Sequence, residues 1–251
     1  MVSISVIKTK DLLSAKERLV LALDVDDFSS AEKLVGLLKD YVRVFKVGNQ
    51  LFTSEGAKII NMINKAKARV FLDLKFHDIP NTVKGAAESA TKLGVYMFNV
   101  HASGGYEMMK AAADAARETS IKLGIKKPLV LGVTVLTSIN QEILEKEIGV
   151  NRVIKEHVVH LAKLAKSAGL DGVVASPHEI KDIRDVCGKN FVILTPGIRP
   201  AGEELDDQKR IMTPKQALEQ GADFIVIGRP IRNAENPVEA ARNIIREMEG
   251  E

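Results

Sequence analysis

Apolar segments of strand length recur along the whole chain and alternate with segments whose apolar residues have helical spacing. The predicted strands are rich in β-branched residues and occupy residues 19–25, 42–48, 68–74, 95–100, 128–136, 171–176, 191–198 and 223–228. Helical spacing is clearest in residues 29–40, 81–93, 105–118 and 153–169. Strands that are almost continuously apolar, separated by amphipathic helices, indicate a parallel sheet that is buried on both faces.

The number of these units favours one closed barrel. Eight β/α units in 251 residues match a (β/α)₈ TIM barrel, which is the most economical architecture for them. A doubly wound open sheet is the alternative, but no GxGxxG motif follows the first predicted strand. Because no linker or shift in composition divides the chain, we expect a single α/β domain over residues 1–251, with a short lead-in up to about residue 18.

The composition limits the classes of function. The chain is 45% hydrophobic and 27% charged, as is usual for a soluble domain with a full core. Its net charge of +3 is spread along the sequence, which argues against a nucleic-acid partner but suits an anionic small molecule. Cys187 is the only cysteine, and no Cys/His cluster has the spacing of a structural zinc site. We therefore expect no bound metal and a reducing, cytoplasmic setting.

Neither a signal peptide nor a membrane span is predicted. Residues 1–18 lack an unbroken apolar core of signal-peptide length, and the longest apolar run, residues 128–136, is far too short to cross a bilayer. We expect a protein that is neither exported by that route nor embedded in a membrane.

Polar residues collect where the predicted strands end. The first five strands carry or end in Asp24, Lys46, Asp73 with Lys75, Asn99 with His101, and Thr134 with Thr137. In a parallel barrel the carboxyl ends of all strands open onto the same face, where the loops of such enzymes carry the chemistry. The sequence therefore predicts a catalytic site at that face.

The densest group of charges follows the third predicted strand, in the segment DLKFHDIPNT at residues 73–82. Side chains alternate across a strand, so Asp73 and Lys75 share one face and the leucines beside them take the other. With the leucines turned toward the helices, the charged pair points into the mouth of the barrel. Burying such a pair costs several kcal/mol per ion unless its geometry offsets the loss, so we favour a catalytic role over a structural ion pair.

Asp78 lies beyond this strand, because Pro80 prevents the strand from continuing. Its carboxylate either caps the following helix or completes an array of alternating charge with Asp73 and Lys75, and the residues alone favour neither interpretation. A lysine between two carboxylates is suited to donating a proton rather than to acting as an amine nucleophile.

The last two predicted strands lead into segments that are suited to phosphate. TPGIRP supplies Gly197 and Arg199, and IGRP supplies Gly228 and Arg229. Barrel enzymes frequently hold phosphate with these two loops, where glycine lets the backbone approach and arginine offers a planar fork. The polar segment between them, residues 201–212, is predicted to be a lid from which Gln208 reaches the ligand.

Together these motifs resemble the orotidine 5′-phosphate decarboxylase family, in particular its bacterial branch. Besides DLKFHDIPNT, the resemblance rests on ALD at 22–24, FKVG at 45–48, NVHASGG at 99–105, GVTVLTS at 132–138, DGVVAS at 171–176, TPGIRP at 195–200 and IGRPI at 227–231. The motifs occur in family order over essentially the whole chain, and their combination is specific, whereas DxKxxD alone is shared with related sugar-phosphate barrels. The resemblance implies a lyase of pyrimidine biosynthesis that converts orotidine 5′-monophosphate to UMP and CO₂ without a metal or cofactor.

Roles for single residues follow from the resemblance. It implies that Lys75 protonates C6 of the pyrimidine, with Asp73 and Asp78 as its charged neighbours. It also implies a homodimer in which Asp78 and Thr82 reach the partner's site near the ribose. The expected substrate contacts are Asp24 and Lys46 at the ribose, Thr137 at the pyrimidine, and Arg199, Gln208, Gly228 and Arg229 at the phosphate.

Two alternatives stay open at the level of the sequence. A related sugar-phosphate decarboxylase or aldolase of the same superfamily would require Mg²⁺, although HDIPNT after the lysine argues against it. The other alternative is a catalytically inactive barrel that binds nucleotides, although Lys75 and both aspartates are intact.

Overall fold

The computed structural model describes residues 13–200 and 212–250 and contains a closed barrel of eight parallel strands. The strands are β1 (Leu19–Ala22), β2 (Val44–Gly48), β3 (Arg69–Phe76), β4 (Met97–His101), β5 (Leu129–Val133), β6 (Gly172–Val174), β7 (Val192–Thr195) and β8 (Phe224–Ile227). Each strand pairs with its neighbours in sequence order, and β8 closes the barrel against β1. All eight predicted strands are present, so the predicted (β/α)₈ barrel is confirmed.

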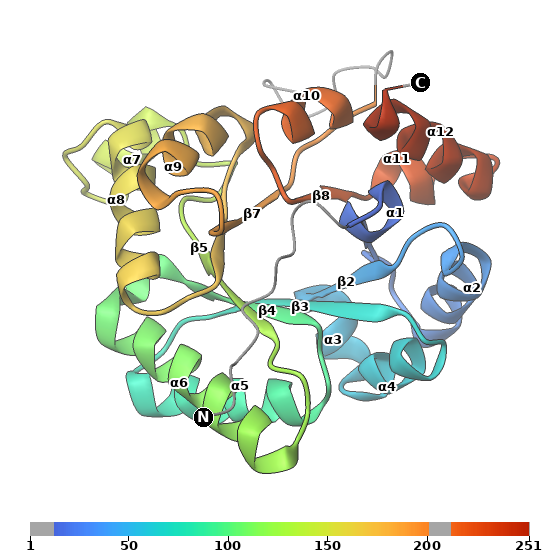
Figure 1. Cartoon of the computed structure of the whole chain (residues 1–251), viewed down its shortest axis with the longest axis horizontal. Helices are drawn as coiled ribbons and strands as arrows, with labels where there is room; N and C mark the ends of the chain where they lie inside the picture. The colour runs from blue at the N-terminus through green and yellow to red at the C-terminus, as the bar shows by residue number, and fades with distance from the viewer. Residues whose placement is uncertain (1–12, 201–211, 251) are drawn as a thin grey trace.

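Helices form an outer layer around the strands (Figure 1). They are α1 (Ala15–Arg18), α2 (Phe28–Leu38), α3 (Asn49–Glu55), α4 (Lys58–Lys65), α5 (Pro80–Lys92), α6 (Gly105–Leu123), α7 (Gln141–Lys146), α8 (Ile154–Ser167), α9 (Ile180–Cys187), α10 (Pro214–Glu219), α11 (Arg229–Arg232) and α12 (Pro237–Glu249), with 3₁₀ turns η1 (Ala102–Gly104) and η2 (Pro177–Glu179). Among the helices of residues 13–200 and 212–250, none has both the length and the apolar character that spanning a bilayer requires.

The predicted lead-in contains α1. Residues 1–12 lie outside the described part of the chain, so the extent of the domain stays a prediction.

Polar side chains fix the first residue of several helices. Asp27 accepts a hydrogen bond from Ser30 N at 2.8 Å at the start of α2, and Asn236 accepts one from Glu239 N at 3.1 Å at the start of α12. Each bond satisfies a backbone amide that has no partner within its helix. The helices therefore begin at defined residues, which sets the length of the loops that leave the strands.

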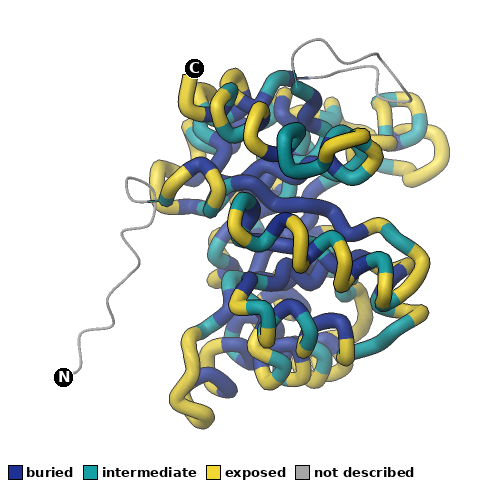
Figure 2. Tube along the Cα trace, turned by 90° about the vertical axis from the view of Figure 1, so that its right-hand side faces the viewer, coloured by how far each residue is buried: buried dark blue, intermediate teal, exposed yellow. Residues whose placement is uncertain are grey.

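The strands divide the apolar residues into two cores. Side chains that face the barrel axis form the inner core: Val20, Ala22, Val44, Phe71, Met97, Leu131, Leu194, Phe224 and Val226. Their neighbours along each strand, such as Leu21, Phe45 and Leu72, face the helices and belong to the larger outer core. Figure 2 shows the result as a buried centre inside helices whose outer sides are exposed. This alternation fixes which way each residue near the end of a strand points.

Two carboxylates, one buried and one partly exposed, hold the strands together at their amino ends. Asp223, directly before β8, pairs with Arg184 of α9 at 2.9 Å and accepts a hydrogen bond from Ile193 N of β7 at 2.8 Å. Asp171, before β6, accepts a hydrogen bond from Val130 N of β5 at 2.8 Å. Each carboxylate thus ties a strand to its neighbour, at the face of a barrel that supports stability rather than chemistry.

We expect Asp223→Ala to lower the free energy of unfolding by about 3 kcal/mol, because it removes the carboxylate partner of the buried Arg184 guanidinium. Urea denaturation followed by circular dichroism measures this loss. Asp185→Ala is the control, because that carboxylate forms an exposed pair with Lys181 and its removal should change stability little. Equal losses in the two variants would contradict the role given to Asp223.

Candidate active site

A cavity of about 290 Å³ opens at the carboxyl ends of the strands. It is lined by Lys46, Phe71, Asp73, Lys75, Val133, Val135, Leu136, Thr137, Ser138, Val174, Ala175, Leu194, Pro196 and Val226. Three of these, Phe71, Leu194 and Val226, also belong to the inner core, so the barrel interior forms the floor of the cavity. The charged side chains of the lining all come from β2 and β3.

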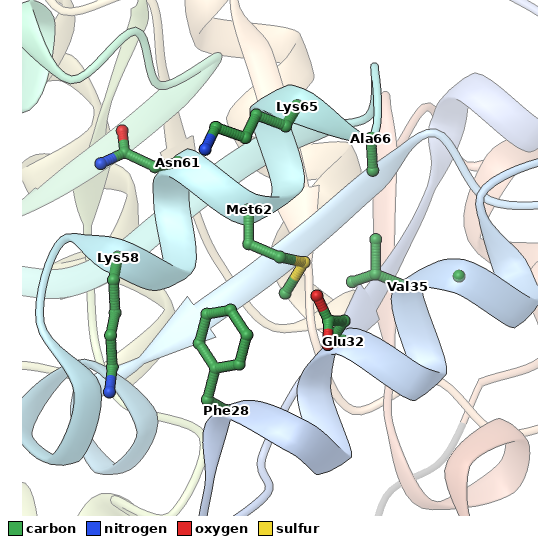
Figure 3. A pocket seen from close by; sticks show the side chains of 9 residues that line it. Phe28, Glu32, Val35, Lys58, Asn61, Met62, Lys65 and Ala66 are labelled. Atoms are coloured by element: carbon green, nitrogen blue, oxygen red, sulfur yellow. The ribbon is translucent and has the colours of Figure 1, made fainter.

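A larger hollow of about 590 Å³ lies outside the barrel, between α2 and α4. Figure 3 shows Phe28 and Met62 in this hollow, with Lys58, Asn61 and Lys65 along α4. These polar side chains point in different directions and do not converge on one point (Figure 3). A binding site needs convergent polar groups in an apolar pocket, so the smaller cavity at the barrel mouth is the candidate active site.

Four charged side chains form a network of alternating sign across this mouth. Lys46 Nζ lies 2.9 Å from Asp24 Oδ1 and 3.5 Å from Asp73 Oδ2. Lys75 Nζ lies 2.7 Å from Asp73 Oδ1. The side chain of Asp73 is 12% exposed, whereas those of Lys75 and Asp24 are 27% and 48% exposed, so the network is buried at Asp73 and open to ligand at its ends. Asp73 and Lys75 therefore share a face, as the alternation of side chains predicts.

The backbone of Lys75 departs from a regular strand. Its φ of 52° lies in the left-handed region, which costs an L-residue about 1–2 kcal/mol. The pairing of β3 with β4 shifts register between Leu72 and Phe76. An irregularity of this kind redirects a side chain, and here the redirected ammonium meets Asp73. Among the described residues, one other non-glycine residue has a positive φ, Lys67, at 59° in the turn before β3.

Asn99 of β4 joins this network; the sequence places it among the polar residues at strand ends but assigns it no role of its own. Its side chain is fully buried, donates a hydrogen bond from Nδ2 to Asp73 Oδ1 at 2.7 Å, and accepts one from Lys75 N at 2.8 Å. A buried polar side chain needs such partners, because burial without them is costly. The signal that points to Asn99 is a polar residue inside the apolar segment 95–100.

Asp78 and Thr82 lie outside the ion-pair network of the single chain. Helix α5 begins at Pro80 with Ile79 as its N-cap, and Asp78 Oδ1 accepts a hydrogen bond from Ile79 N at 2.6 Å. A carboxylate that caps a helix would instead accept a hydrogen bond from the backbone N–H of the second or third helical residue. The structure therefore does not support the capping interpretation of Asp78. Asp78 and Thr82 are both exposed, and neither belongs to the lining of the cavity.

The loop after β7 carries the first residue predicted to bind phosphate. Arg199 is 9% exposed, and its backbone N donates a hydrogen bond to Met212 O at 3.2 Å. This bond holds the two described ends of the predicted lid together. Gln208 and the rest of residues 201–211 lie outside the described part of the chain, so the predicted contact of Gln208 stays a prediction.

The loop after β8 ends beside the charged network. Gly228 is the N-cap of α11, and Arg229 is its first residue. A Cβ built on Gly228 would lie 3.3 Å from Ala22 Cβ and 4.0 Å from Asp24 Oδ2, so the backbone approaches β1 more closely than most side chains allow. Thr137, after β5, lines the cavity from the opposite part of the barrel. Those predicted phosphate, ribose and pyrimidine residues that the structure describes thus lie at or just beyond the carboxyl ends of the strands.

Two histidines border the network. The rings of His77 and His101 lie 5.4 Å apart. Burial lowers the pKa of His101, and the neighbouring His77 and Lys75 lower that pKa further. Asp73 acts in the opposite direction, and the net lowering of the pKa favours the neutral imidazole. Within the residues that the structure describes, no group of three His, Cys, Asp or Glu side chains has the arrangement of a metal site.

The carboxyl face of this (β/α)₈ barrel holds a cavity with alternating carboxylate and ammonium groups. These are the features of a barrel enzyme. The model of the Orotidine 5'-phosphate decarboxylase / HUMPS family matches residues 17–244. The orotidine 5′-phosphate decarboxylase of Moorella thermoacetica is 52% identical over 237 residues, which are 94% of each chain. That of Syntrophomonas wolfei is 56% identical over 238 residues, which are 94% of this chain and 100% of the relative. The chain belongs to this family.

Solved structures of named relatives have the same fold. The orotidine 5′-phosphate decarboxylase from Lactobacillus acidophilus has a TM-score of 0.83 and 39% identity, and the similarity covers 92% of this chain and 99% of that one. The enzyme of that name from Pyrococcus horikoshii OT3 has a TM-score of 0.74 and 29% identity, with 93% and 100% of the two chains covered. The barrel is therefore the family's fold over nearly its full length.

The left-handed backbone of Lys75 yields a test that is independent of activity. Lys75→Gly and Lys75→Ala lose the same ammonium, but only alanine keeps a Cβ in the left-handed region. Relief of the left-handed strain favours glycine by about 1–2 kcal/mol, whereas the larger entropy of glycine in the unfolded chain offsets about 0.4–1 kcal/mol of that gain. The glycine variant should therefore be more stable than the alanine variant by about 0.5–1 kcal/mol. Urea denaturation of the two variants measures the difference. A glycine variant that is less stable than the alanine variant would contradict the backbone strain assigned to Lys75.

Proposed function

We propose that this protein is a carboxy-lyase that converts orotidine 5′-monophosphate to UMP and CO₂, the last step of UMP biosynthesis. The observation that carries the proposal is the 2.7 Å ion pair of Lys75 and Asp73 inside the barrel-mouth cavity of a member of this family. Relatives from three organisms that bear the name of this activity are each more than half identical to this chain.

The reaction places its main demand on electrostatics. Loss of CO₂ from C6 of the pyrimidine leaves an electron pair on a ring carbon that has no neighbouring carbonyl placed to delocalise it. A fixed positive charge beside that carbon stabilises the developing carbanion. In our proposal the Lys75 ammonium supplies this charge and then donates its proton to C6. Water returns a proton to the Lys75 amine, so one proton is consumed for each UMP and CO₂ formed.

Asp73 acts in this proposal by holding the Lys75 ammonium and by facing the carboxylate that leaves. Two unit charges about 4 Å apart repel by roughly 4 kcal/mol at an effective dielectric constant of 20. Full release of that energy in the transition state would raise the rate about a thousandfold. Lys46, 3.5 Å from Asp73, offsets part of the charge, so we assign repulsion the smaller share of catalysis.

The other predicted residues bind the parts of the substrate that do not react. We assign Asp24 and Lys46 to the ribose, Thr137 to the pyrimidine, and Arg199, Gln208, Gly228 and Arg229 to the phosphate. The phosphate is remote from C6, yet its binding energy is available to order the site around the reacting carbon. A substrate that lacks the phosphate should therefore lose turnover as well as affinity.

We further propose a homodimer in which Asp78 and Thr82 complete the partner's site. Both residues are exposed at the start of α5, and Ile79 between them leaves 67% of its surface exposed. A large apolar side chain that is exposed beside charged groups is favourable at an interface. We place the protein in the cytoplasm, where the lone Cys187 stays reduced.

The second candidate function is a Mg²⁺-dependent sugar-phosphate decarboxylase or aldolase. The matching family model names a second group, HUMPS, beside the orotidine 5′-phosphate decarboxylases, so a match to this model alone does not fix the activity. This candidate and the proposed one differ in their need for a divalent cation, which a chelator tests directly.

Purified protein incubated with orotidine 5′-monophosphate and EDTA should turn over the substrate, as followed by the absorbance of the pyrimidine ring. Lys75→Ala should reduce kcat by at least about 10⁴-fold, because it removes both the stabilising charge and the proton donor. Circular dichroism checks that the variant is folded. Loss of wild-type activity with EDTA, restored by Mg²⁺, would favour the second candidate, and tight UMP binding without turnover would indicate an inactive barrel.

The shared site is tested by mixing two inactive variants. Lys75→Ala and Asp78→Ala chains, unfolded and refolded together in equal amounts, should regain about a quarter of wild-type activity, because half of the dimers would contain one intact site of two. Each variant refolded alone is the control. If the mixture stays as inactive as its components, Asp78 does not act in the partner's site.

A further inference from the structure

Asn99 occupies a position between the two residues that carry the proposed reaction. Its Oδ1 accepts a hydrogen bond from Lys75 N at 2.8 Å, and its Nδ2 donates one to Asp73 Oδ1 at 2.7 Å. A backbone N–H can only donate and a carboxylate can only accept, so this orientation of the amide is the one that satisfies both partners. The side chain is fully buried.

The bond to Lys75 N lies where the strand ladder is interrupted. Pairing of β3 with β4 shifts register between Leu72 and Phe76, and Lys75 sits within this gap with its left-handed backbone. A backbone N–H that is buried without a partner is costly, and the Asn99 side chain supplies the partner here. Asn99 thereby holds the main chain of Lys75 in a conformation that a regular strand would not provide.

The bond to Asp73 fixes the other end of the same lysine. Asp73 Oδ1 accepts one hydrogen bond from Asn99 Nδ2 and another from Lys75 Nζ, each at 2.7 Å. Asn99 therefore orients the carboxylate that in turn orients the ammonium. The lining of the barrel-mouth cavity does not include Asn99, and its side chain has no exposed surface with which to touch a ligand.

We propose that Asn99 is a positioning residue, which sets the place of the Lys75 ammonium through the backbone of Lys75 and through Asp73. The proposal rests on the function proposed above, since it concerns the lysine that protonates C6. One side chain acts on both ends of the lysine because its amide combines an acceptor and a donor on one planar group. Leucine has nearly the same shape and neither group, so Asn99→Leu removes both bonds and little volume.

Asn99→Leu should lower kcat about 100-fold and change KM by less than about threefold, because the groups assigned to phosphate and ribose are left in place. Asn64→Leu is the matched control. Asn64 Nδ2 donates a hydrogen bond to Leu93 O at 3.0 Å, away from the barrel mouth, so its loss should affect stability and leave kcat unchanged. A kcat for Asn99→Leu within threefold of wild type would overturn the proposal.

Asn99→Asp adds a readout that a purely structural role would not produce. The charged and titratable groups around this position are Asp73 and Lys75 of β3, Lys46 of β2 and His101 of β4. Protonated, the new carboxyl group can accept from Lys75 N and donate to Asp73 as the amide does. Ionised, it loses the donor and repels Asp73, and that repulsion raises the pKa of the new carboxyl group.

The ratio of the kcat of Asn99→Asp to that of wild type should therefore fall by at least about tenfold as the pH rises from about 5.5 to 8. A ratio that does not change with pH would overturn the proposal. If Asn99→Leu fails to fold, this pH dependence still distinguishes a positioning role of Asn99 from a purely structural one.

Hydrogen exchange provides a test that needs no substrate. Mass spectrometry of peptides that span residues 71–76 should show faster exchange in Asn99→Leu than in wild type, because Lys75 N loses its acceptor, and no such change in Asn64→Leu. Unchanged exchange in these peptides would overturn the positioning role. If wild-type protein does not act on orotidine 5′-monophosphate, the proposed function fails, while this measurement still decides the structural role of Asn99.

Discussion

The site depends on the ion pair between Lys75 and Asp73. Two charges that are so little exposed lose hydration worth several kcal/mol per ion, and they remain charged only if other groups replace the water. Three neighbouring strands provide these groups for a single carboxylate: Lys46 from β2, Lys75 from β3 and Asn99 from β4. The mouth of the barrel is thus organised around Asp73, the most buried charge of the network.

The two ends of the barrel use carboxylates in opposite ways. At the amino ends, Asp223 and Asp171 accept backbone amides of adjacent strands, so their charge serves the sheet itself. At the carboxyl ends, Asp24 and Asp73 pair with lysine side chains that reach into a cavity and can also meet a ligand. The same residue type therefore supports folding at one face and chemistry at the other, as the architecture of such barrels allows.

Periodicity made much of this arrangement predictable. The apolar segments define all eight strands, and the alternation of side chains places Asp73 beside Lys75. The left-handed backbone of Lys75 was not predictable, because alternation assumes a regular strand. The role of Asn99 depends on the register between β3 and β4, which the sequence of one strand does not specify. The roles of all the predicted site residues stay predictions, and those of Asp78, Thr82 and Gln208 also depend on a second chain or on residues outside the described part.

The two lysines with positive φ, Lys67 and Lys75, differ in what their strain means for a protein engineer. Lys67 lies in the turn before β3, and its geometry serves only to connect α4 to the strand. Glycine or asparagine there would relieve strain and leave the barrel mouth untouched. At position 75 the same relief would remove the ammonium that we propose as the proton donor. Substitutions that raise thermal stability can thus be made at the amino ends of the strands without loss of the proposed activity. At the carboxyl ends, a gain in stability would be accompanied by a loss of turnover.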